Sequence, residues 1–208
     1  MPVLVFGTHN RKKAAELVDL LCGIDVTLRT LADFDDAIEV DESGSTFAEN
    51  AAAKATAQAR HLGQWVLGDD SGLVVDALDG SPGIYSARYA GEKATDADNR
   101  RKLLEALVDV RQIERRTAHF ACHLALADPR GNVRLTSAGR CSGRIRFEAS
   151  GSGGFGYDPL FEVVEYHRTF GELSPAVKAC LSHRARAMGA LVPQLVALLA
   201  SGAWQADD

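Results

Sequence analysis

The stretch Leu67-Gly68-Asp69-Asp70-Ser71-Gly72-Leu73 places two adjacent carboxylates directly after Trp65 to Leu67, a short apolar run that predicts a buried strand. The Ser71-Gly72 pair that follows indicates a turn. Acidic side chains are seldom buried alone, so two at the end of such a strand need a cation, hydrogen-bond donors or a shared proton. A divalent metal ion with phosphate oxygens would meet this need. A solvated turn in which one Asp caps the next element is the simpler alternative.

The composition is that of an ordinary globular protein, with 46% apolar and 25% charged residues. A chain of 208 residues is long enough for one sizeable core, so we expect a single domain over residues 1–208, with two lobes. The formal net charge of -5 argues against binding to a nucleic acid backbone, which needs a basic surface. An anionic substrate requires positive charge that is gathered locally.

The sequence shows no targeting or membrane-spanning signal. The segment Met1 to Phe6 lacks the basic start and long apolar core of a signal peptide, and no run of about 18 uncharged apolar residues is present. We therefore expect no membrane partner and a cytoplasmic location. The cysteines show neither a C-x-x-C pair nor zinc-ligand spacing, which fits a reduced compartment and predicts buried thiols. They are Cys22, Cys122, Cys141 and Cys180.

Strand and helix signals alternate along the chain, which predicts an α/β fold with a mixed sheet. A capping box of Thr46 and Glu49 indicates a helix start, and Gly63 indicates its end. We expect Pro193 to kink or split the last helix, and the tail from Trp204 to Asp208 to fray. The patterns predict strands at residues 3–6, 26–28, 65–67, 73–75, 118–127, 132–141 and 143–148, and helices at residues 11–22, 49–61, 96–108 and 183–199.

The loop from Gly151 to Gly156 matches the pattern G-x-G-x-x-G, but we reject a dinucleotide-binding site. That motif joins a strand to a helix whose N-terminus meets the pyrophosphate, whereas Tyr157 to Phe161 reads as a turn into a strand. The loop is then a flexible connection or the floor of a ligand site. In the second case Phe155 or Tyr157 would stack on a flat ring and Asp158 would accept a hydrogen bond from it.

The segment Thr8 to Lys13 follows a predicted strand and opens a predicted helix. Free amides and the positive dipole end of a helix suit phosphate binding, and Asn10 and Lys13 add a donor and a charge. The alternative is an ordinary N-cap at Thr8 or Asn10 beside solvated basic residues. Because basic residues in the first turn oppose the helix dipole, their presence favours anion binding.

Several more polar residues have no decisive pattern of their own. Glu42, next to Asp41, would be a surface acid, and Lys54 would ordinarily face solvent. His183 and Arg184 open the last helix, where they could cap it or extend along its surface. An Arg side chain also has the geometry to read two acceptors on one purine edge. The remaining histidines show no metal-ligand spacing.

Six segments occur in one order along nearly the whole chain, and together they resemble the inosine triphosphate pyrophosphatase family, which includes the dITP/XTP pyrophosphatases. Each segment alone is a weak signal, but all six in this order are specific. The segments are Thr8-His9-Asn10-Arg11-Lys12-Lys13, Thr46-Phe47-Ala48-Glu49-Asn50-Ala51-Ala52-Ala53-Lys54-Ala55, Asp69-Asp70-Ser71-Gly72-Leu73, Gly80-Ser81-Pro82-Gly83-Ile84-Tyr85-Ser86-Ala87-Arg88-Tyr89, Phe155-Gly156-Tyr157-Asp158-Pro159-Leu160-Phe161, and Lys178 with Ser182-His183-Arg184.

The resemblance implies an α/β fold in which a long mixed sheet and flanking helices form two lobes around a central cleft. It implies a homodimer that hydrolyses the non-standard purine nucleoside triphosphates ITP, dITP and XTP to the monophosphate and pyrophosphate. It also implies Mg²⁺ as the cofactor and removal of these nucleotides from the cellular pool as the purpose.

Site residues follow from the resemblance position by position. Asp70 is the expected general base for the attacking water, and Glu42 and Asp70 are the expected Mg²⁺ contacts, with Asp69 close by. The phosphates are expected to lie against the first motif and Lys54, Ser71 against the substrate, and Phe155 against the base. The expected substrate-binding residues are Thr8, His9, Asn10, Arg11, Lys12, Lys13, Lys54, Ser71, Phe155, Gly156, Tyr157, Asp158, Lys178, His183 and Arg184, of which Asp158, Lys178, His183 and Arg184 would read the base edge.

Physical chemistry refines two of these expectations. A carboxylate beside Mg²⁺ stays ionised, so Asp70 is expected to orient the water and to accept its proton only weakly. Selection of 6-keto over 6-amino purines needs hydrogen-bond donors aimed at O6. His9 stands where the family commonly has Gly, so a positive φ at this position would strain His9 unless the turn differs.

Three alternative functions stay open at the level of sequence. A nucleotidyl- or phosphoryl-transferase could have a similar metal site, but it would need an acceptor pocket that the sequence does not reveal. A nucleotide-binding regulatory module gains little from carboxylates placed near phosphates. A purely structural α/β domain would leave the paired Asp residues, Lys178 and the Ser-His-Arg cluster as coincidence.

Overall fold

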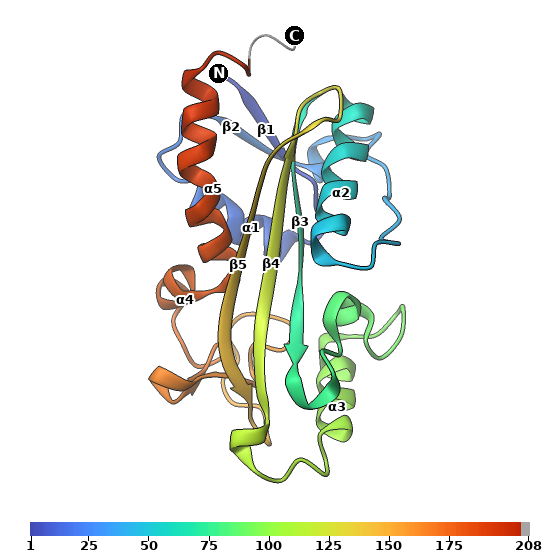
Figure 1. Ribbon diagram of the computed structural model, residues 1–208, viewed down its shortest axis with the longest axis vertical. Coiled ribbons are helices and arrows are strands. Elements are labelled where there is room, and N and C mark those ends of the chain that lie inside the picture. Colours follow the sequence, from blue (N-terminus) through green and yellow to red (C-terminus); the bar gives the residue numbers. More distant parts are fainter. Residues whose placement is uncertain (205–208) are drawn as a thin grey trace. The chain divides into compact units, whose positions relative to one another are not determined.

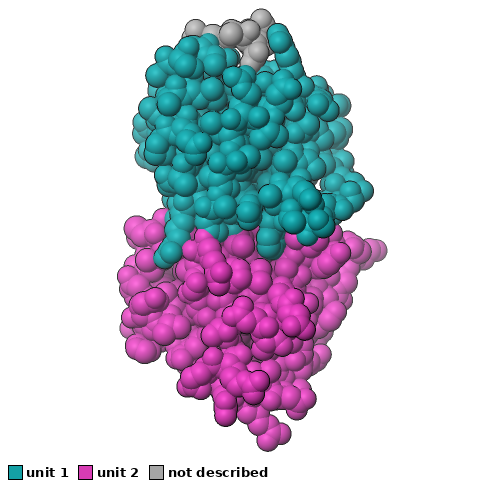
Figure 2. Space-filling model, in the orientation of Figure 1, with its two compact units in different colours: residues 1–70, 122–139, 184–208 teal, residues 71–121, 140–183 magenta. Residues whose placement is uncertain are grey.

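The computed structural model describes residues 1–204 and divides them into two compact units (Figure 2). Unit 1 contains residues 1–70, 122–139 and the chain from residue 184, and unit 2 contains residues 71–121 and 140–183. Each unit is therefore built from segments that are distant in sequence. The expected single domain over the whole chain stays a prediction.

The described residues form one seven-stranded sheet in the order β2-β1-β3-β4-β5-β6-β7 (Figure 1). β1 pairs in parallel with both β2 and β3, whereas β6 pairs antiparallel with both β5 and β7. The sheet is mixed, and helices accompany it, so the predicted α/β class is confirmed. The strands are β1 (Val3–Phe6), β2 (Thr27–Thr30), β3 (Trp65–Val75), β4 (Thr117–Ala127), β5 (Val133–Ile145), β6 (Phe161–Val163) and β7 (Arg168–Thr169), and the α-helices are α1 (Arg11–Leu20), α2 (Phe47–Leu62), α3 (Asp96–Ala106), α4 (Pro175–Leu181) and α5 (His183–Ala200).

In unit 1 the strands send alternate side chains to two different helical layers, as the period of a strand requires. Leu4 and Phe6 of β1 belong to a core that includes Leu17 of α1 and Leu191 of α5, whereas Val5 belongs to a core with the small residues of α2. Figure 1 shows α1 and α5 beside one face of these strands and α2 beside the other. The alternation fixes which helix each side chain of β3 meets.

Unit 2 has its own apolar core. Phe120 of β4 and Phe161 of β6 lie 4.6 Å apart between ring centroids, and Phe170 stacks on Phe161 at 5.4 Å. Leu103 and Leu107, at the end of α3, are fully buried in the same core. A dense aromatic cluster of this kind holds the short strands of unit 2 in place.

β3 differs from the prediction. The sequence suggested a turn at Ser71-Gly72, but Trp65–Val75 is one continuous strand. β3 is hydrogen-bonded to β4 as its neighbour in the sheet, and these backbone hydrogen bonds outweigh the local turn preference of Ser and Gly. The two carboxylates thus lie within a strand and not in a solvated loop.

Pro193 does not split the last helix, which runs unbroken over His183–Ala200. Proline removes the hydrogen bond to the carbonyl of residue 189, but Pro193 and Gly189 are both exposed, so water can satisfy that carbonyl. The remaining predicted helices agree with the structure within a few residues. The capping box of Thr46 and Glu49 is present, and Gly63 ends α2 with a left-handed φ of 61°.

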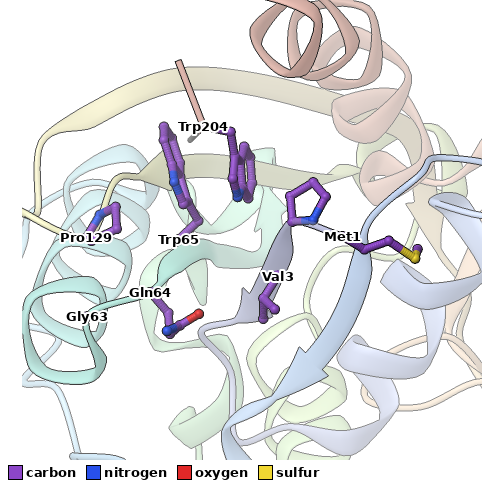
Figure 3. A pocket seen from close by; sticks show the side chains of 8 residues that line it. Met1, Val3, Gly63, Gln64, Trp65, Pro129 and Trp204 are labelled. Atoms are coloured by element: carbon purple, nitrogen blue, oxygen red, sulfur yellow. The ribbon is translucent and has the colours of Figure 1, made fainter. Parts of the chain in front are cut away.

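Trp204 was expected to fray, but it is buried. Its indole stacks on Trp65 with ring centroids 4.2 Å apart, and the guanidinium of Arg134 lies 5.7 Å from the Trp65 ring. Figure 3 shows the two indoles at a pocket of about 280 Å³ that Pro129 also lines. Stacking of two large aromatic rings overcomes the tendency of a chain end to fray. The rest of the predicted tail, residues 205–208, lies outside the described residues.

The cysteine prediction is half right. Cys122 and Cys141 are buried, whereas Cys22 and Cys180 are exposed, and none of these four residues forms a disulfide. Cys180 lies on the outer side of the short helix α4, where the sequence carries no amphipathic signal long enough to orient it.

Among residues 1–204, no helix has the length and apolar character needed to cross a membrane.

Gly68 permits the close approach of α2 to β3, and its replacement provides a test of this packing. A Cβ at Gly68 would collide with the carbonyl oxygen of Ala51 and come within 2.9 Å of the Ala55 nitrogen. Both are backbone atoms of α2, so they cannot move aside individually. We expect Gly68→Ala to lower the free energy of unfolding by about 2 kcal/mol or more, measured by urea denaturation.

Gly189→Ala is the matched control, because Gly189 lies in α5 and has no atom within 4 Å of the added Cβ. Alanine should raise the stability there by about 0.5–1 kcal/mol through helix propensity. Equal effects of the two substitutions would show that α2 does not constrain residue 68.

Candidate active site

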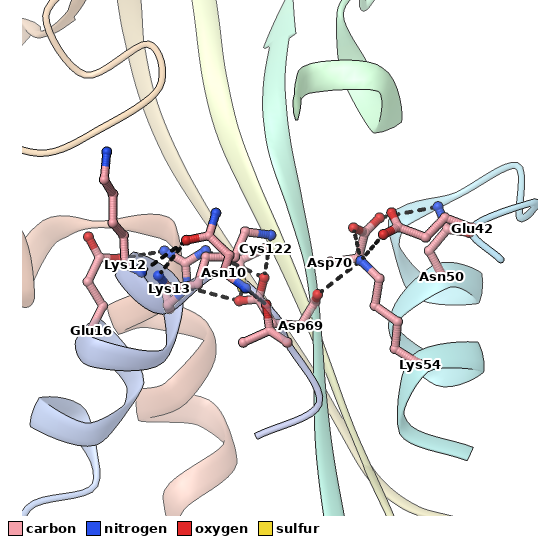
Figure 4. Close-up of polar contacts among 12 residues, drawn as sticks. Asn10, Lys12, Lys13, Glu16, Glu42, Asn50, Lys54, Asp69, Asp70 and Cys122 are labelled. Atoms are coloured by element: carbon pink, nitrogen blue, oxygen red, sulfur yellow. Dashed lines mark hydrogen bonds and ion pairs between the residues drawn. The ribbon is translucent and has the colours of Figure 1, made fainter. Parts of the chain in front are cut away.

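Asp69 and Asp70 point to opposite faces of β3, as neighbouring residues of a strand must (Figure 4). Asp69 lies on the face covered by α1 and α5, and Asp70 on the face covered by α2. Both are buried, with 1% and 4% of their surface exposed. Each therefore needs its own partners, and each finds a different set.

Asp69 is surrounded by donors. Lys13 Nζ lies 2.9 Å from Oδ1, and Arg184 Nε donates to Oδ2 at 2.8 Å. The thiol of Cys122 on β4 donates to the same Oδ2 at 3.3 Å. Burial alone would raise the pKa of Asp69, but the charges of Arg184 and Lys13 hold that pKa well below its ordinary value. Asp69 is therefore an ionised carboxylate at neutral pH, and it holds these cations in place.

Arg184 is the other half of this buried ion pair. Its guanidinium is 1% exposed, and Nη1 also donates to Glu16 Oε2 of α1 at 2.5 Å. Burial opposes the charge of Arg184, yet the surrounding carboxylates raise its pKa above the ordinary value. Arg184 therefore links α5, β3 and α1 of unit 1. Its predicted role at the base edge stays a prediction, and these contacts give it a structural role in addition.

Asp70 meets a different environment on the other face. Lys54 Nζ lies 2.9 Å from Asp70 Oδ1 and 3.0 Å from Glu42 Oε1, so one ammonium group joins the two carboxylates (Figure 4). Asn50 Nδ2 donates to Asp70 Oδ2 at 3.3 Å. Lys54, expected to face solvent, is instead largely buried, with 13% of its side chain exposed. Helix α2 presents both Asn50 and Lys54 because they are four residues apart.

The two adjacent carboxyl groups are shifted in opposite directions. Burial is the main reason that the pKa of Asp70 is raised; the charge of Glu42 adds to the rise, and Lys54 and Lys13 only partly oppose it. For Lys54, burial acts to lower the pKa, but Asp70 and Glu42 together raise it. Carboxylates with divergent pKa values commonly have different chemical tasks. Of the two carboxylates, Asp70 is thus the one that is protonated more readily, and its expected role as general base stays a prediction.

A divalent cation fits the residues around Lys54. Glu42 and Asp70 approach one positive charge from separate segments, and carboxylate oxygen is the donor that Mg²⁺ prefers. No group of three or more His, Cys, Asp or Glu residues within residues 1–204 forms a metal cluster, so substrate phosphates and water would complete the shell. Asp69 points to the opposite face of β3, and its expected place near the metal stays a prediction.

The start of α1 contains the first predicted motif. Asn10 is the N-cap, and its Oδ1 accepts hydrogen bonds from the amides of Lys12 and Lys13 at 3.0 and 3.2 Å. The amide of Asn10 donates to Thr8 Oγ1 at 3.2 Å. The cap alternative is thus correct for Asn10, while Arg11 and Lys12 are exposed. Their phosphate contacts stay predictions.

His9 does not carry the backbone strain considered from the sequence. Within the described residues only Asp79 and His167 combine a side chain with positive φ. The turn at residues 7–10 therefore accommodates an ordinary side chain at position 9. His9 Nε2 lies 3.3 Å from the carbonyl oxygen of Ile38, in the segment that also carries Glu42.

Unit 2 gathers a second set of predicted residues. Lys178 Nζ on α4 lies 2.6 Å from Asp158 Oδ2, which also accepts from the amide of Phe155 at 2.8 Å. The same ammonium group lies 4.7 Å from the centre of the Phe155 ring. Asp158 and Lys178 are buried, whereas Phe155 is partly exposed. This arrangement holds one aromatic ring beside one cation, which suits a flat heterocycle with polar edges.

The neighbouring residues fix the shape of this loop. Gly156 accepts from Arg100 at 2.7 Å through its carbonyl and donates to Asp96 at 2.9 Å through its amide. The hydroxyl of Tyr157 donates to the Ser86 carbonyl oxygen at 2.9 Å. Burial, which is the main cause, raises the pKa of Tyr157, so it remains a neutral donor. The loop is thus anchored to α3 and is not a flexible connection.

Two further predicted residues belong to unit 2. His183 is buried and stacks on Phe120 with ring centroids 4.8 Å apart. Ser71 directly follows Asp70 in β3 and is partly exposed. Their contacts with a substrate stay predictions.

Three residues at the paired Asp residues were missed from the sequence: Asn50, Cys122 and Glu16. Asn50 stands four residues before Lys54 in the same segment, and this spacing was the available signal. Cys122 had none, because the contact depends on the pairing of β3 with β4. Glu16 had no signal either, because it contacts Arg184, which is 168 residues away in sequence.

Comparison with known proteins shows the family to which the chain belongs. The family model described as the Ham1 family matches residues 4–194. The chain belongs to the Ham1 family. The family resemblance inferred from the six segments is confirmed by this match and by curated relatives. A dITP/XTP pyrophosphatase from Rhodopirellula baltica is 55% identical over 203 residues, covering 98% of this chain and 97% of the relative.

Solved structures of the family confirm the fold. A HAM1 protein from Coxiella burnetii has a TM-score of 0.86 at 39% identity, covering 94% of this chain and 99% of that protein. A nucleoside-triphosphatase from Mycobacterium abscessus, also named dITP/XTP pyrophosphatase, has a TM-score of 0.74 at 42% identity. It covers 93% of this chain and 100% of its own length.

Removal of Arg184 tests the buried ion pair. We expect Arg184→Ala to lower the free energy of unfolding by about 3 kcal/mol or more at pH 7, because Asp69 would keep a buried charge without its main partner. Arg111→Ala, which removes the same side chain at an exposed position, is the control and should change stability by about 0.5 kcal/mol or less.

The same pair makes a prediction about pH. The folded-state pKa of Asp69 lies below the ordinary value of 3.8. The ionised Asp69 therefore contributes its full stabilisation of the folded state above the ordinary pKa, and this contribution is lost as the pH falls through the folded-state pKa. The difference in stability between wild type and Arg184→Ala should therefore shrink in acid. A difference that stays constant from pH 7 down to pH 3 in urea unfolding would contradict the ion pair.

Proposed function

We propose that this protein hydrolyses ITP, dITP and XTP to the nucleoside monophosphate and pyrophosphate, with Mg²⁺ as cofactor, and so removes these nucleotides from the pool. The observation that carries the proposal is the group formed by Asp70, Lys54 and Glu42: a buried carboxylate of raised pKa beside a cation and a second carboxylate. Relatives at 44–55% identity are named dITP/XTP pyrophosphatases, which supports the substrate class.

Glu42 and Asp70 are the residues that would hold Mg²⁺. Their oxygens already share one cation in Lys54, and both come from unit 1. When bound, Mg²⁺ supplies positive charge that neutralises phosphate oxygens. We leave Asp69 out of this set because Lys13, Arg184 and Cys122 occupy its carboxylate.

The proposed reaction is attack of water on the α-phosphorus of the substrate. Asp70 orients the water and accepts its proton, a new oxygen–phosphorus bond forms, and the bond from the α-phosphorus to the bridging oxygen breaks. Pyrophosphate leaves with the electron pair of that bond. Lys13 and Lys54 balance the charge of the phosphates. Burial raises the pKa of Asp70 and favours proton acceptance, but a bound Mg²⁺ would lower that pKa again, so Asp70 mainly orients the water and accepts its proton weakly.

Recognition of the purine is assigned to the cluster in unit 2. Phe155 offers a ring face, and Lys178 is a donor suited to a 6-keto oxygen. A 6-amino group is itself a hydrogen-bond donor and would face the Lys178 ammonium donor to donor, which penalises ATP. The cytoplasmic location and the homodimer are parts of the proposal that rest on the sequence alone, and sedimentation of the purified protein tests the dimer.

A substrate panel tests the proposed function. We expect pyrophosphate from ITP and XTP in the presence of Mg²⁺, little from ATP or GTP, and none when a chelator is added. Pyrophosphate and orthophosphate should be measured separately. Orthophosphate as the first product would exclude attack at the α-phosphorus, and nucleotide binding without cleavage would favour a regulatory module.

Asp70→Asn tests whether Asp70 is the general base. It removes a charge at nearly constant shape and should lower kcat by about 100-fold or more while the protein remains folded. Wild-type turnover in this variant would remove Asp70 from the reaction.

The selection of the purine base is tested separately, by replacing Lys178 or Arg184. Lys178→Met should reduce the preference for ITP over ATP in kcat/KM by about tenfold or more, because it removes the donor that we assign to the 6-keto oxygen. Arg184→Ala is the comparison, since its guanidinium is bound to Asp69 and Glu16. If Arg184→Ala changes the ITP to ATP ratio more than Lys178→Met does, Arg184 reads the base edge as the sequence suggested.

A further inference from the structure

Asn50 is a fully buried amide in the first turn of α2, with no surface exposed. Its two polar atoms have different partners. Oδ1 accepts from the amide of Gly44 at 2.9 Å, and Nδ2 donates to Asp70 Oδ2 at 3.3 Å. A single side chain therefore joins β3 to the segment before α2, as Figure 4 shows for its approach to Asp70.

The segment that Asn50 anchors carries Glu42. Residues 37–44 have no regular secondary structure, so side-chain contacts must hold their position. Gly44 lies so close to α2 that an added Cβ would come within 2.5 Å of Asn50 Oδ1 and 2.8 Å of Glu49 Cβ. The loop is thus packed directly against the amide, and Glu42 is two residues away from that contact.

The two oxygens of Asp70 are divided between two residues of one helix face. Lys54 takes Oδ1 and Asn50 takes Oδ2, which fixes the rotation of the carboxyl group about its bond to Cβ. Lys54 also holds Glu42, so Asn50 and Lys54 together connect both carboxylates to α2. Without the amide, the carboxyl group keeps its charge partner but loses its orientation.

We propose that Asn50 is a positioning residue for the hydrolysis: it sets the orientation of Asp70 and holds the Glu42 loop in register with it. This inference rests on the proposed function, because it needs Asp70 to act on water.

Gln58 provides a matched comparison within the same helix. It lies eight residues after Asn50 on the same face of α2, and it is also buried, with 1% of its surface exposed. Its Nε2 donates to the carbonyl oxygen of Ile38, at the far end of the same loop, and none of its contacts is with Asp70 among those that the described residues show. Gln58 therefore shares the loop-anchoring role but not the proposed positioning role.

Three variants separate the two roles of Asn50. Asn50→Asp keeps an oxygen that accepts from Gly44 but replaces the donor to Asp70 by a second carboxylate oxygen. Asn50→Ala removes both contacts, and Gln58→Ala removes only the anchor at Ile38. We expect kcat for ITP to fall about tenfold or more in both Asn50 variants, with KM changed by about threefold or less, and to stay within about twofold in Gln58→Ala.

Hydrogen exchange gives a readout that is independent of turnover. The amide of Gly44 should remain protected in Asn50→Asp and become exchangeable in Asn50→Ala, and urea unfolding should show that each variant is folded. The decisive combination is a protected Gly44 amide with reduced kcat in Asn50→Asp, because a loop anchor alone would not produce it.

Wild-type kcat in Asn50→Asp would overturn the inference, as would equal losses in Asn50→Ala and Gln58→Ala. If Asn50→Asp does not fold, the comparison of Asn50→Ala with Gln58→Ala decides. If the wild-type protein itself cleaves none of the nucleotides, the proposed function fails and the positioning role falls with it, whereas wild-type cleavage with insensitive variants rejects the positioning role alone.

Discussion

The site depends on the placement of two consecutive carboxylates on opposite faces of one buried strand. A buried carboxylate is tolerated only when cations or donors offset its lost hydration, so each face of β3 must supply its own set. α1 and α5 supply Lys13 and Arg184 to Asp69, and α2 supplies Lys54 and Asn50 to Asp70. The two carboxylates can therefore be buried in β3 only if α1, α5 and α2 are placed where their side chains reach them.

The opposite pKa shifts of the two residues have a simple origin. Asp69 is the more deeply buried, yet two cations contact it, and their charges outweigh the desolvation. Asp70 has one contacting cation, which it shares with Glu42, so burial prevails. The number of cations that contact each carboxylate thus explains why two neighbours in sequence have pKa values shifted in opposite directions.

Much of this was predictable from sequence, and the failures have physical reasons. Short-range signals such as the capping box at Thr46 and the helix end at Gly63 were read correctly because their partners lie within four residues. Ser71-Gly72 was misread as a turn because sheet pairing overrode local preference. Contacts between distant segments, such as that of Cys122 with Asp69, depend on strand order, which periodicity does not encode.

The alternation along β3 also makes the length of this strand critical in a way that loop lengths are not. Gly68, Asp69 and Asp70 each match one face, with Gly68 against α2, Asp69 among cations and Asp70 beside Lys54. Deletion of a single residue between Trp65 and Gly68 would turn each later residue of β3 to the opposite face of the sheet. Asp69 would then take the place of Gly68 against α2, where there is no room for a side chain. A change in the length of this strand should therefore disrupt the site, whereas a change in the length of a surface loop should not.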